Sequence, residues 1–227
     1  MNDVIETTGM ILAGADYSEY DKRLKVLTSD LGKVTVFARG VRRQNSKYMG
    51  MTDMFVFGEI RLFAGKSAYN LSGIEVSNYF EGIRQDMEKL CYASYFADLA
   101  DYSVRENMDG RGVLLLLYRS LQALDTASID NRLVRAVYEL RMVMENGVYP
   151  GLPERKILPG TASAMRHIEE ADIRSLYSFK VKEDVQSELI HTADAYRKRY
   201  LQGSFRSLEV MGAMGYDTGM ENTVKAE

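Results

Sequence analysis

GMILAGADYSEYDKRLKVLTSDLGKVTVFARGVRR, residues 9–43, contains three short runs of apolar and β-branched residues. The turn-forming segment YSEYD separates the first run from the second, and Leu-Gly separates the second from the third. Short runs that bunch or alternate apolar residues between turn signals predict β-strands. Two further runs of this kind follow, so five strands are predicted at 9–17, 24–30, 33–41, 54–64 and 68–76.

Five short strands joined by hairpin-like turns favour a small barrel or sandwich. The OB type is the leading choice because it has five strands, although the pattern alone leaves an SH3-like barrel open. We therefore expect residues 1–80 to form an OB-type domain.

After Phe80 the apolar spacing becomes helical. Residues Leu133, Val137, Leu140 and Met144 illustrate this, since they fall on one stripe of a helix. Helices are predicted at 84–104, 110–125, 131–146, 161–170 and 182–202. The fold class is thus α+β, with an N-terminal five-stranded OB-type β-barrel followed by an all-α helical domain, residues 81–227.

The segment between the third and fourth helices is expected to be a connector. Residues 149–161, YPGLPERKILPGT, contain all three prolines of the chain. Gly147 is a plausible C-cap before this segment, and Thr161 is a candidate N-cap after it.

The composition of the chain excludes several classes of protein. The chain has 227 residues, a formal net charge of −3 and one cysteine, which excludes an internal disulfide and a zinc site built from cysteines. The polar N-terminus does not resemble a signal peptide, and the apolar run VLLLLY at 113–118 is too short to cross a bilayer. These features predict a soluble cytoplasmic protein that has no contact with membranes.

Residue patterns for covalent chemistry are weak. AGKS at 64–67 resembles the end of a phosphate-binding loop, but Ile60 occupies the position of the required glycine, and the segment lies between two predicted strands. His167 and His191 lie on separate predicted helices without ligand spacing, and Cys91 lies beside an apolar face. We therefore expect neither an enzyme nor a bound cofactor.

A basic stretch between the third and fourth predicted strands is the strongest binding signal. Residues 31–52 contain five cations and no Asp or Glu; the cations are Lys33, Arg39, Arg42, Arg43 and Lys47. On a barrel, such a loop can follow phosphates, and Tyr48 could offer a stacking face. The alternative is a solvated surface loop that contacts no ligand.

Several motifs, in order, resemble the RecO family of bacterial recombination mediators. The resemblance begins with the segment at 9–43 and continues through RQDMEKLCYASY (84–95) and YELRMVMENGVYP (138–150). It ends with YRKRYLQGSFRSLEVM (196–211) and so covers nearly the whole chain.

This resemblance implies an N-terminal OB domain, a C-terminal helical domain and no covalent chemistry. It also implies binding of single- and double-stranded DNA, annealing of complementary strands and a cytoplasmic, nucleoid-associated location. With RecR, such a protein helps to load RecA onto single strands covered by the single-strand-binding protein, SSB. The acidic, hydrophobic C-terminal tail of SSB would dock on the helical domain, where Arg132, Arg135 and Arg141 are candidates.

One departure from the family pattern concerns zinc. Many family members carry two C-x-x-C pairs after a Gly-Tyr-x-Pro segment. Here Tyr149-Pro150 is followed by no cysteine, and a connector around 148–160 replaces the zinc module. We therefore expect no zinc in this chain.

The expected DNA ligands are residues of the basic stretch. Arg39, Arg42, Arg43 and Lys47 are the leading phosphate contacts, Lys33 and Tyr48 come next, and Lys22 and Arg23 are possible additions. Four to five contacts predict a log–log salt slope of about −3 to −4 for single strands. The alternatives are an OB-domain scaffold that binds protein without DNA and, resting on AGKS alone, a nucleotide-using enzyme.

Overall fold

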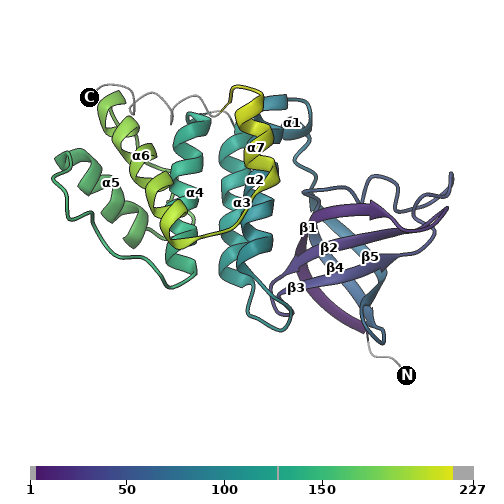
Figure 1. Cartoon of the computed structure of the whole chain (residues 1–227). Helices are drawn as coiled ribbons and strands as arrows, with labels where there is room; N and C mark the ends of the chain where they lie inside the picture. The colour runs from purple at the N-terminus through teal and green to yellow at the C-terminus, as the bar shows by residue number, and fades with distance from the viewer. Residues whose placement is uncertain (1–3, 127, 217–227) are drawn as a thin grey trace. The chain divides into compact units, whose positions relative to one another are not determined.

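The computed structural model describes residues 4–126 and 128–216, in which five strands are followed by seven helices (Figure 1). The chain divides into two compact units. The barrel unit comprises Met1–Glu81 and Ala100–Tyr118, and the helical unit comprises Gly82–Leu99 and Arg119–Glu227. Each unit is described separately below.

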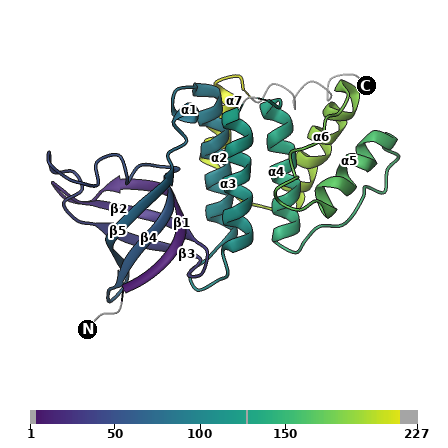
Figure 2. The same cartoon turned by 180° about the vertical axis from the view of Figure 1, so that it is seen from behind.

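The five strands close into a barrel. Their bounds are β1 (Val4–Asp16), β2 (Lys22–Thr28), β3 (Lys33–Ala38), β4 (Phe57–Ala64) and β5 (Tyr69–Asn78). The order around the barrel is β1-β2-β3-β5-β4; β3 and β5 pair in parallel and the other pairs are antiparallel (Figures 1 and 2). The predicted five-stranded OB-type barrel is confirmed.

Alternation along the strands fixes which side chains fill the barrel. In β2 and β3, the residues Leu24, Val26, Val34, Val36 and Ala38 are buried, because one face of each strand points inward. β1 is long enough to pair with both β2 and β4, and its register shifts between Ile11 and Ala13, as expected where a strand bends around a barrel. The opposite faces of β2 and β3 carry polar and aromatic residues, except for the buried Leu27.

The segment at residues 104–110 completes the barrel unit by pairing with the β2–β3 turn. Asn107 donates its backbone N–H to the carbonyl of Leu31, and Gly110 donates to Ser29. Gly32 has a φ of +68°, and a Cβ there would lie 2.1 Å from the carbonyl oxygen of Arg105. Only glycine therefore fits this tight turn.

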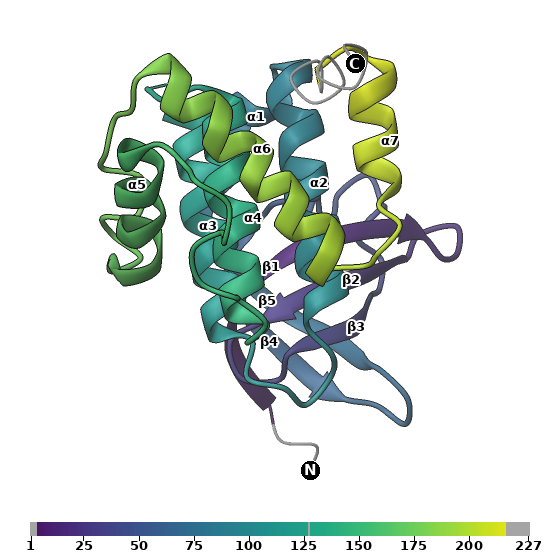
Figure 3. The ribbon, with the colours of Figure 1, turned by 60° about the vertical axis from the view of Figure 1, so that its left-hand side comes forward.

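The helices are α1 (Glu81–Arg84), α2 (Met87–Ser103), α3 (Arg111–Thr126), α4 (Asn131–Glu145), α5 (Pro159–Glu170), α6 (Glu183–Tyr200) and α7 (Arg206–Ala213). Figure 3 shows α6 along α4, and both contact α5. In the core, the rings of Phe96 and Tyr138 stack with centroids 4.3 Å apart, and the Tyr138 hydroxyl donates to the carbonyl of Phe96.

The structure corrects three helix predictions. The helix expected at 84–104 divides at Asp86, whose carboxylate accepts from the backbone N–H of Lys89 as in a capped N-terminus. α5 starts at Pro159, two residues before the predicted cap Thr161, because proline suits the first turn of a helix. The short helix α7 was not predicted.

Candidate nucleic-acid interface

The basic loop, residues 39–56 between β3 and β4, is anchored to the β1–β2 turn. Gly40, with a φ of +67°, donates its backbone N–H to Asp21 Oδ1 at 2.7 Å. This hydrogen bond is the main reason that the pKa of Asp21 lies below its ordinary value. The backbone N–H of Arg42 also donates to the carbonyl of Tyr20 at 3.0 Å. The β1–β2 turn and the basic loop therefore present one continuous surface.

Arg42 holds this surface together. One guanidinium nitrogen donates to the carbonyls of Ser18 and Glu19, at 3.1 and 3.2 Å, and another lies 3.1 Å from Asp16 Oδ2. Three acceptors thus already surround this side chain. A phosphate would have to displace these acceptors in order to bind Arg42. We call Arg42 a clamp, because its bonds hold the basic loop against the β1–β2 turn.

Two predicted lysines are paired with carboxylates. Lys33 lies 2.9 Å from Asp101 Oδ1, while Lys25 lies 2.7 Å from Asp101 Oδ2. Burial tends to raise the pKa of Asp101, but the hydrogen bonds from Lys25 and Lys33 outweigh burial and hold the pKa below its usual range. Lys22 is similarly paired with Asp53 at 3.0 Å.

Tyr48 is built into the barrel surface. Its hydroxyl donates to the carbonyl of Ser72 at 2.8 Å, its ring packs against the barrel core, and the Lys47 ammonium lies 4.9 Å from the ring centroid. These contacts fasten the middle of the basic loop. Tyr48 is accordingly only partly exposed, with the Lys47 ammonium over its ring.

Four cations of this surface remain exposed and form no ion pair with the described residues. They are Arg23 on β2 together with Arg39, Arg43 and Lys47 of the basic loop. The Arg43 guanidinium lies 5.5 Å from the ring centroid of Tyr20. We call these four residues the open cations, because their charge is available to an anionic ligand.

An aromatic pair lies on the same surface and was missed by the sequence reasoning. Tyr17 is 61% exposed, and its ring centroid is 4.7 Å from that of Phe37. Phe37 points outward because Val36 and Ala38 point into the barrel, and Phe37 pairs across the ladder with Arg23. Strand alternation could have placed Phe37 outside, whereas Tyr17 was predicted at the junction of the first strand and the following turn, where alternation does not indicate a direction.

AGKS forms the turn of the β4–β5 hairpin, as predicted. The backbone N–H of Gly65 donates to the carbonyl of Ala68 at 2.9 Å, and Ala64 pairs with Tyr69. A phosphate-binding loop would lead from a strand into a helix, so this turn lacks the required context.

The three arginines proposed for α4 occupy different environments. Arg135 is 3% exposed, and its Nε lies 2.9 Å from Glu139 Oε1, so its burial excludes it from partner contact. Arg141 donates to the carbonyls of Ile168 and Glu169 at the end of α5. Arg132 is half-exposed and bonded to Asp130.

Arg135 belongs to a buried charge cluster of the helical unit. Glu139 Oε1 also accepts from the Tyr95 hydroxyl at 2.7 Å, and Arg197 donates to Asp194 at 2.7 Å. Each of the four charged residues, Arg135, Glu139, Asp194 and Arg197, is at most 8% exposed. This cluster joins α4 to α6 and uses its cations internally.

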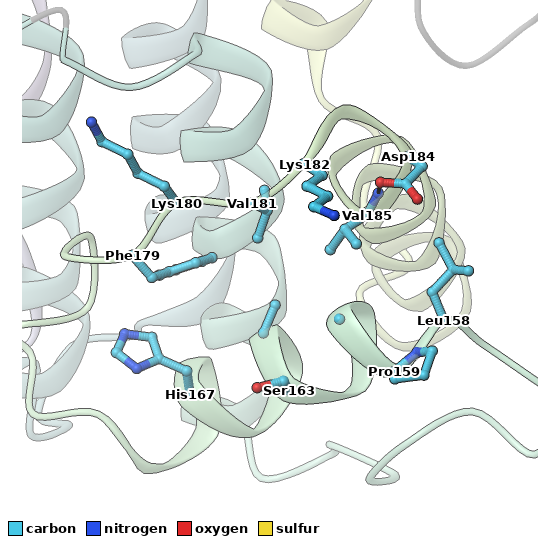
Figure 4. A pocket seen from close by; sticks show the side chains of 12 residues that line it. Leu158, Pro159, Ser163, His167, Phe179, Lys180, Val181, Lys182, Asp184 and Val185 are labelled. Atoms are coloured by element: carbon cyan, nitrogen blue, oxygen red, sulfur yellow. Dashed lines mark hydrogen bonds between the residues drawn. The ribbon is translucent and has the colours of Figure 1, made fainter.

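A groove of about 540 Å³ lies between the start of α5 and the segment that enters α6 (Figure 4). The ring of Phe179 lies beside His167, with centroids 4.9 Å apart, and Val181 and Val185 add apolar surface. Lys180 and Lys182 belong to the same lining. Asp184 also lines the groove (Figure 4), which thus combines apolar surface with two cations and one acid.

The remaining candidates for chemistry are isolated. Cys91 is buried and its sulfur lies 3.5 Å from that of Met214; burial raises the pKa of the thiol. Across residues 4–126 and 128–216, no three His, Cys, Asp or Glu side chains are grouped so as to hold a metal ion. Within the same ranges, no helix has the length and hydropathy needed to cross a membrane.

Two family models and several known proteins match this chain. Residues 1–80 match the family model "Recombination protein O N terminal", and residues 84–154 match "Recombination protein O C terminal". DNA repair protein RecO of Acetivibrio thermocellus is 24% identical over 238 residues, covering 90% of this chain and 95% of that protein.

Other relatives match over a shorter region. DNA repair protein RecO of Clostridium perfringens is 32% identical over 144 residues, covering 63% of this chain and 58% of that protein. The protein of the same name from Exiguobacterium is 31% identical over 147 residues, covering 65% and 59%. The chain thus spans less than two thirds of the length of these two relatives. Two consecutive family models and a relative that covers 90% of the chain agree, and the chain belongs to the RecO family of DNA repair and recombination proteins.

Proposed function

We propose that this protein is a recombination mediator that binds single- and double-stranded DNA and anneals complementary strands. With RecR, it would help to load RecA onto single strands covered by SSB. The observation that carries the proposal is the set of open cations on the OB barrel of a RecO-family chain. Arg23, Arg39, Arg43 and Lys47 are exposed and form no ion pair with the described residues.

The physical basis is neutralisation of phosphates. Each phosphate that a cation neutralises releases condensed counterions, which makes the affinity depend on salt. Four open cations give a log–log slope of about −3 for single strands, at ~0.7 for each contact. Phosphate contacts position a strand without reading its sequence, so binding should be largely sequence-independent. A strand held by its phosphates can leave base edges available to a complementary strand.

Strand annealing tests this function directly. The substrates are two complementary oligonucleotides, with and without SSB, and the proteins are the natural chain and the triple variant Arg39→Ala, Arg43→Ala, Lys47→Ala. We expect the natural chain to accelerate annealing and the variant to lose most of that acceleration.

A matched control removes three exposed cations from the helical unit: Lys156→Ala, Arg166→Ala, Arg174→Ala. This variant has the same net charge as the triple variant and should anneal like the natural chain. Equal losses in both variants would mean that only net charge matters. Absence of annealing and of any gel shift by the natural chain would favour the alternative, an OB-domain scaffold that binds protein.

The apolar groove of Figure 4 favours a second contact, with the acidic, hydrophobic tail of SSB. Phe179, Val181 and Val185 offer apolar surface, and Lys180 and Lys182 offer charge opposite to that of the tail. Peptides of this kind dock where apolar pockets and cations adjoin. Arg132 on α4 remains a second candidate position.

Calorimetry with the tail peptide separates the two positions. Loss of the binding heat in Lys180→Ala, Lys182→Ala places the tail in the groove, whereas loss in Arg132→Ala places it on α4. No heat from the natural chain at high micromolar peptide would contradict docking altogether.

A further inference from the structure

We infer that Tyr17, backed by Phe37, is a base-stacking platform that makes this barrel prefer single strands to duplex. The inference rests on the proposed DNA-binding function and adds a ligand subsite to it. The ligand is an unpaired nucleobase, since the bases of a duplex are stacked on one another and cannot offer their faces to a side chain.

Exposure and rigidity support this role for Tyr17. The side chain is 61% exposed, which is unusual for a large aromatic residue without a partner to cover it. Phe37 contacts one side of the ring, at a centroid distance of 4.7 Å and an interplanar angle of 57°. The backbone N–H of Tyr17 donates to the carbonyl of Asp21 at 3.0 Å, which closes the turn. A ring held in this way loses little conformational entropy when a base stacks on it.

The charges around the ring fit a strand whose bases face the barrel. Phe37 pairs with Arg23 across the ladder, and Arg39 begins the basic loop two residues after Phe37. Nearby acids are largely engaged: Asp16 pairs with Arg42, and Asp21 accepts from Gly40. Glu19 remains an exposed acid of the turn. Cations flanking an aromatic face are the usual arrangement in proteins that bind single strands.

Arg42 links the platform to the phosphate contacts. Its bonds to Asp16 and to the carbonyls of Ser18 and Glu19 hold the turn that bears Tyr17 against the basic loop that bears Arg43. One strand can therefore place its bases on Tyr17 and its phosphates on the open cations at the same time.

An oligonucleotide without bases isolates the stacking contribution. Fluorescence anisotropy would compare a labelled 12-mer of thymidylate with an abasic 12-mer of the same backbone, using the full chain and its variants Tyr17→Ala and Tyr17→Phe. We expect Tyr17→Ala to weaken binding of the thymidylate strand by about 5- to 150-fold, the range for one stacked base. Binding of the abasic strand and the salt slope should not change, and Tyr17→Phe should behave like the natural chain.

The outcomes distinguish this inference from the proposed function. If Tyr17→Ala weakens both strands equally, or neither, while the natural chain binds DNA, the stacking platform is contradicted and DNA binding stands. If the natural chain binds neither strand, both proposals fail. A selective loss on the strand that carries bases supports the platform, because a purely structural defect would affect both strands.

Discussion

The basic loop of the barrel and the α4–α6 contact of the helical unit both contain arginines, yet the arginines differ in what surrounds them. Arg39 and Arg43 are exposed and form no close ion pair with the described residues, although the charges of both help to lower the pKa of Asp21. Arg135 and Arg197 are at most 8% exposed and bonded to Glu139 and Asp194. A cation that is buried with its partner stabilises the fold, whereas a cation left in solvent without one can bind a phosphate.

The largest effect is expected from the buried cluster. Replacing Glu139 by Ala leaves Arg135 buried without its nearest carboxylate, and removal of one partner of a buried pair typically costs about 3–5 kcal/mol. Urea unfolding would measure this loss in the free energy of unfolding. The exposed Glu170→Ala serves as the control and should change stability by less than about 0.5 kcal/mol. Equal stability of the two variants would show that the cluster contributes little.

The neighbouring residues Arg42 and Arg43 provide a sharper contrast, because they share a loop and a charge. Arg42→Ala removes the clamp and should cost about 1 kcal/mol of stability while leaving the salt slope of DNA binding unchanged. Arg43→Ala should leave stability nearly unchanged and make the slope shallower by about 0.7. Thermal unfolding and anisotropy titrations at several salt concentrations measure the two quantities. A slope change in Arg42→Ala would contradict its role as a clamp.

The pairing of Asp101 makes the stability of the barrel unit depend on pH. Its pKa lies below the ordinary value because hydrogen bonds from Lys25 and Lys33 outweigh burial. A depressed pKa stabilises the fold at pH values above the unfolded-state pKa, near 4, and this contribution is lost as the pH falls through the folded-state pKa. Asp101→Asn should therefore lower stability at pH 7 and reduce the difference in stability between pH 7 and pH 3. An unchanged difference would argue against the pairing.

The smallest expected effect is that of a metal chelator. Ion pairs between Arg135 and Asp194 and between Arg197 and Glu139 join α4 to α6, and residues 148–160 contain no cysteine. Excess EDTA should leave the melting temperature unchanged. A lower melting temperature that zinc restores would show that a metal contributes to this unit after all.

Local patterns predicted most of the fold. Alternation along β2 and β3 indicated the barrel, because buried valines such as Val34 and Val36 recur every second residue. The break at Asp86 and the start of α5 at Pro159 also had local signals, an acidic N-cap and a proline in the first turn. The predicted bounds of these two helices were wrong because they followed the apolar spacing, whereas the capping residue and the proline determine where the helices begin.

Pairing between distant residues explains what could not be predicted at the site. Charge counting found the basic loop, but Lys33 contacts Asp101, which lies 68 residues away in the sequence, and Arg42 contacts Ser18, 24 residues away. No local pattern reports such contacts. The same limit applies to Tyr17 and Phe37, whose rings meet only because β1 and β2 close a hairpin beside β3.

The most direct test of the proposed interface is the salt dependence of single-strand binding by the natural chain and by Arg39→Ala, Arg43→Ala, Lys47→Ala. With four open cations, the natural chain should give a log–log slope of about −3, and the triple variant, with Arg23 left, a slope of about −1. Equal slopes for the two proteins would contradict the assignment of these cations to DNA phosphates.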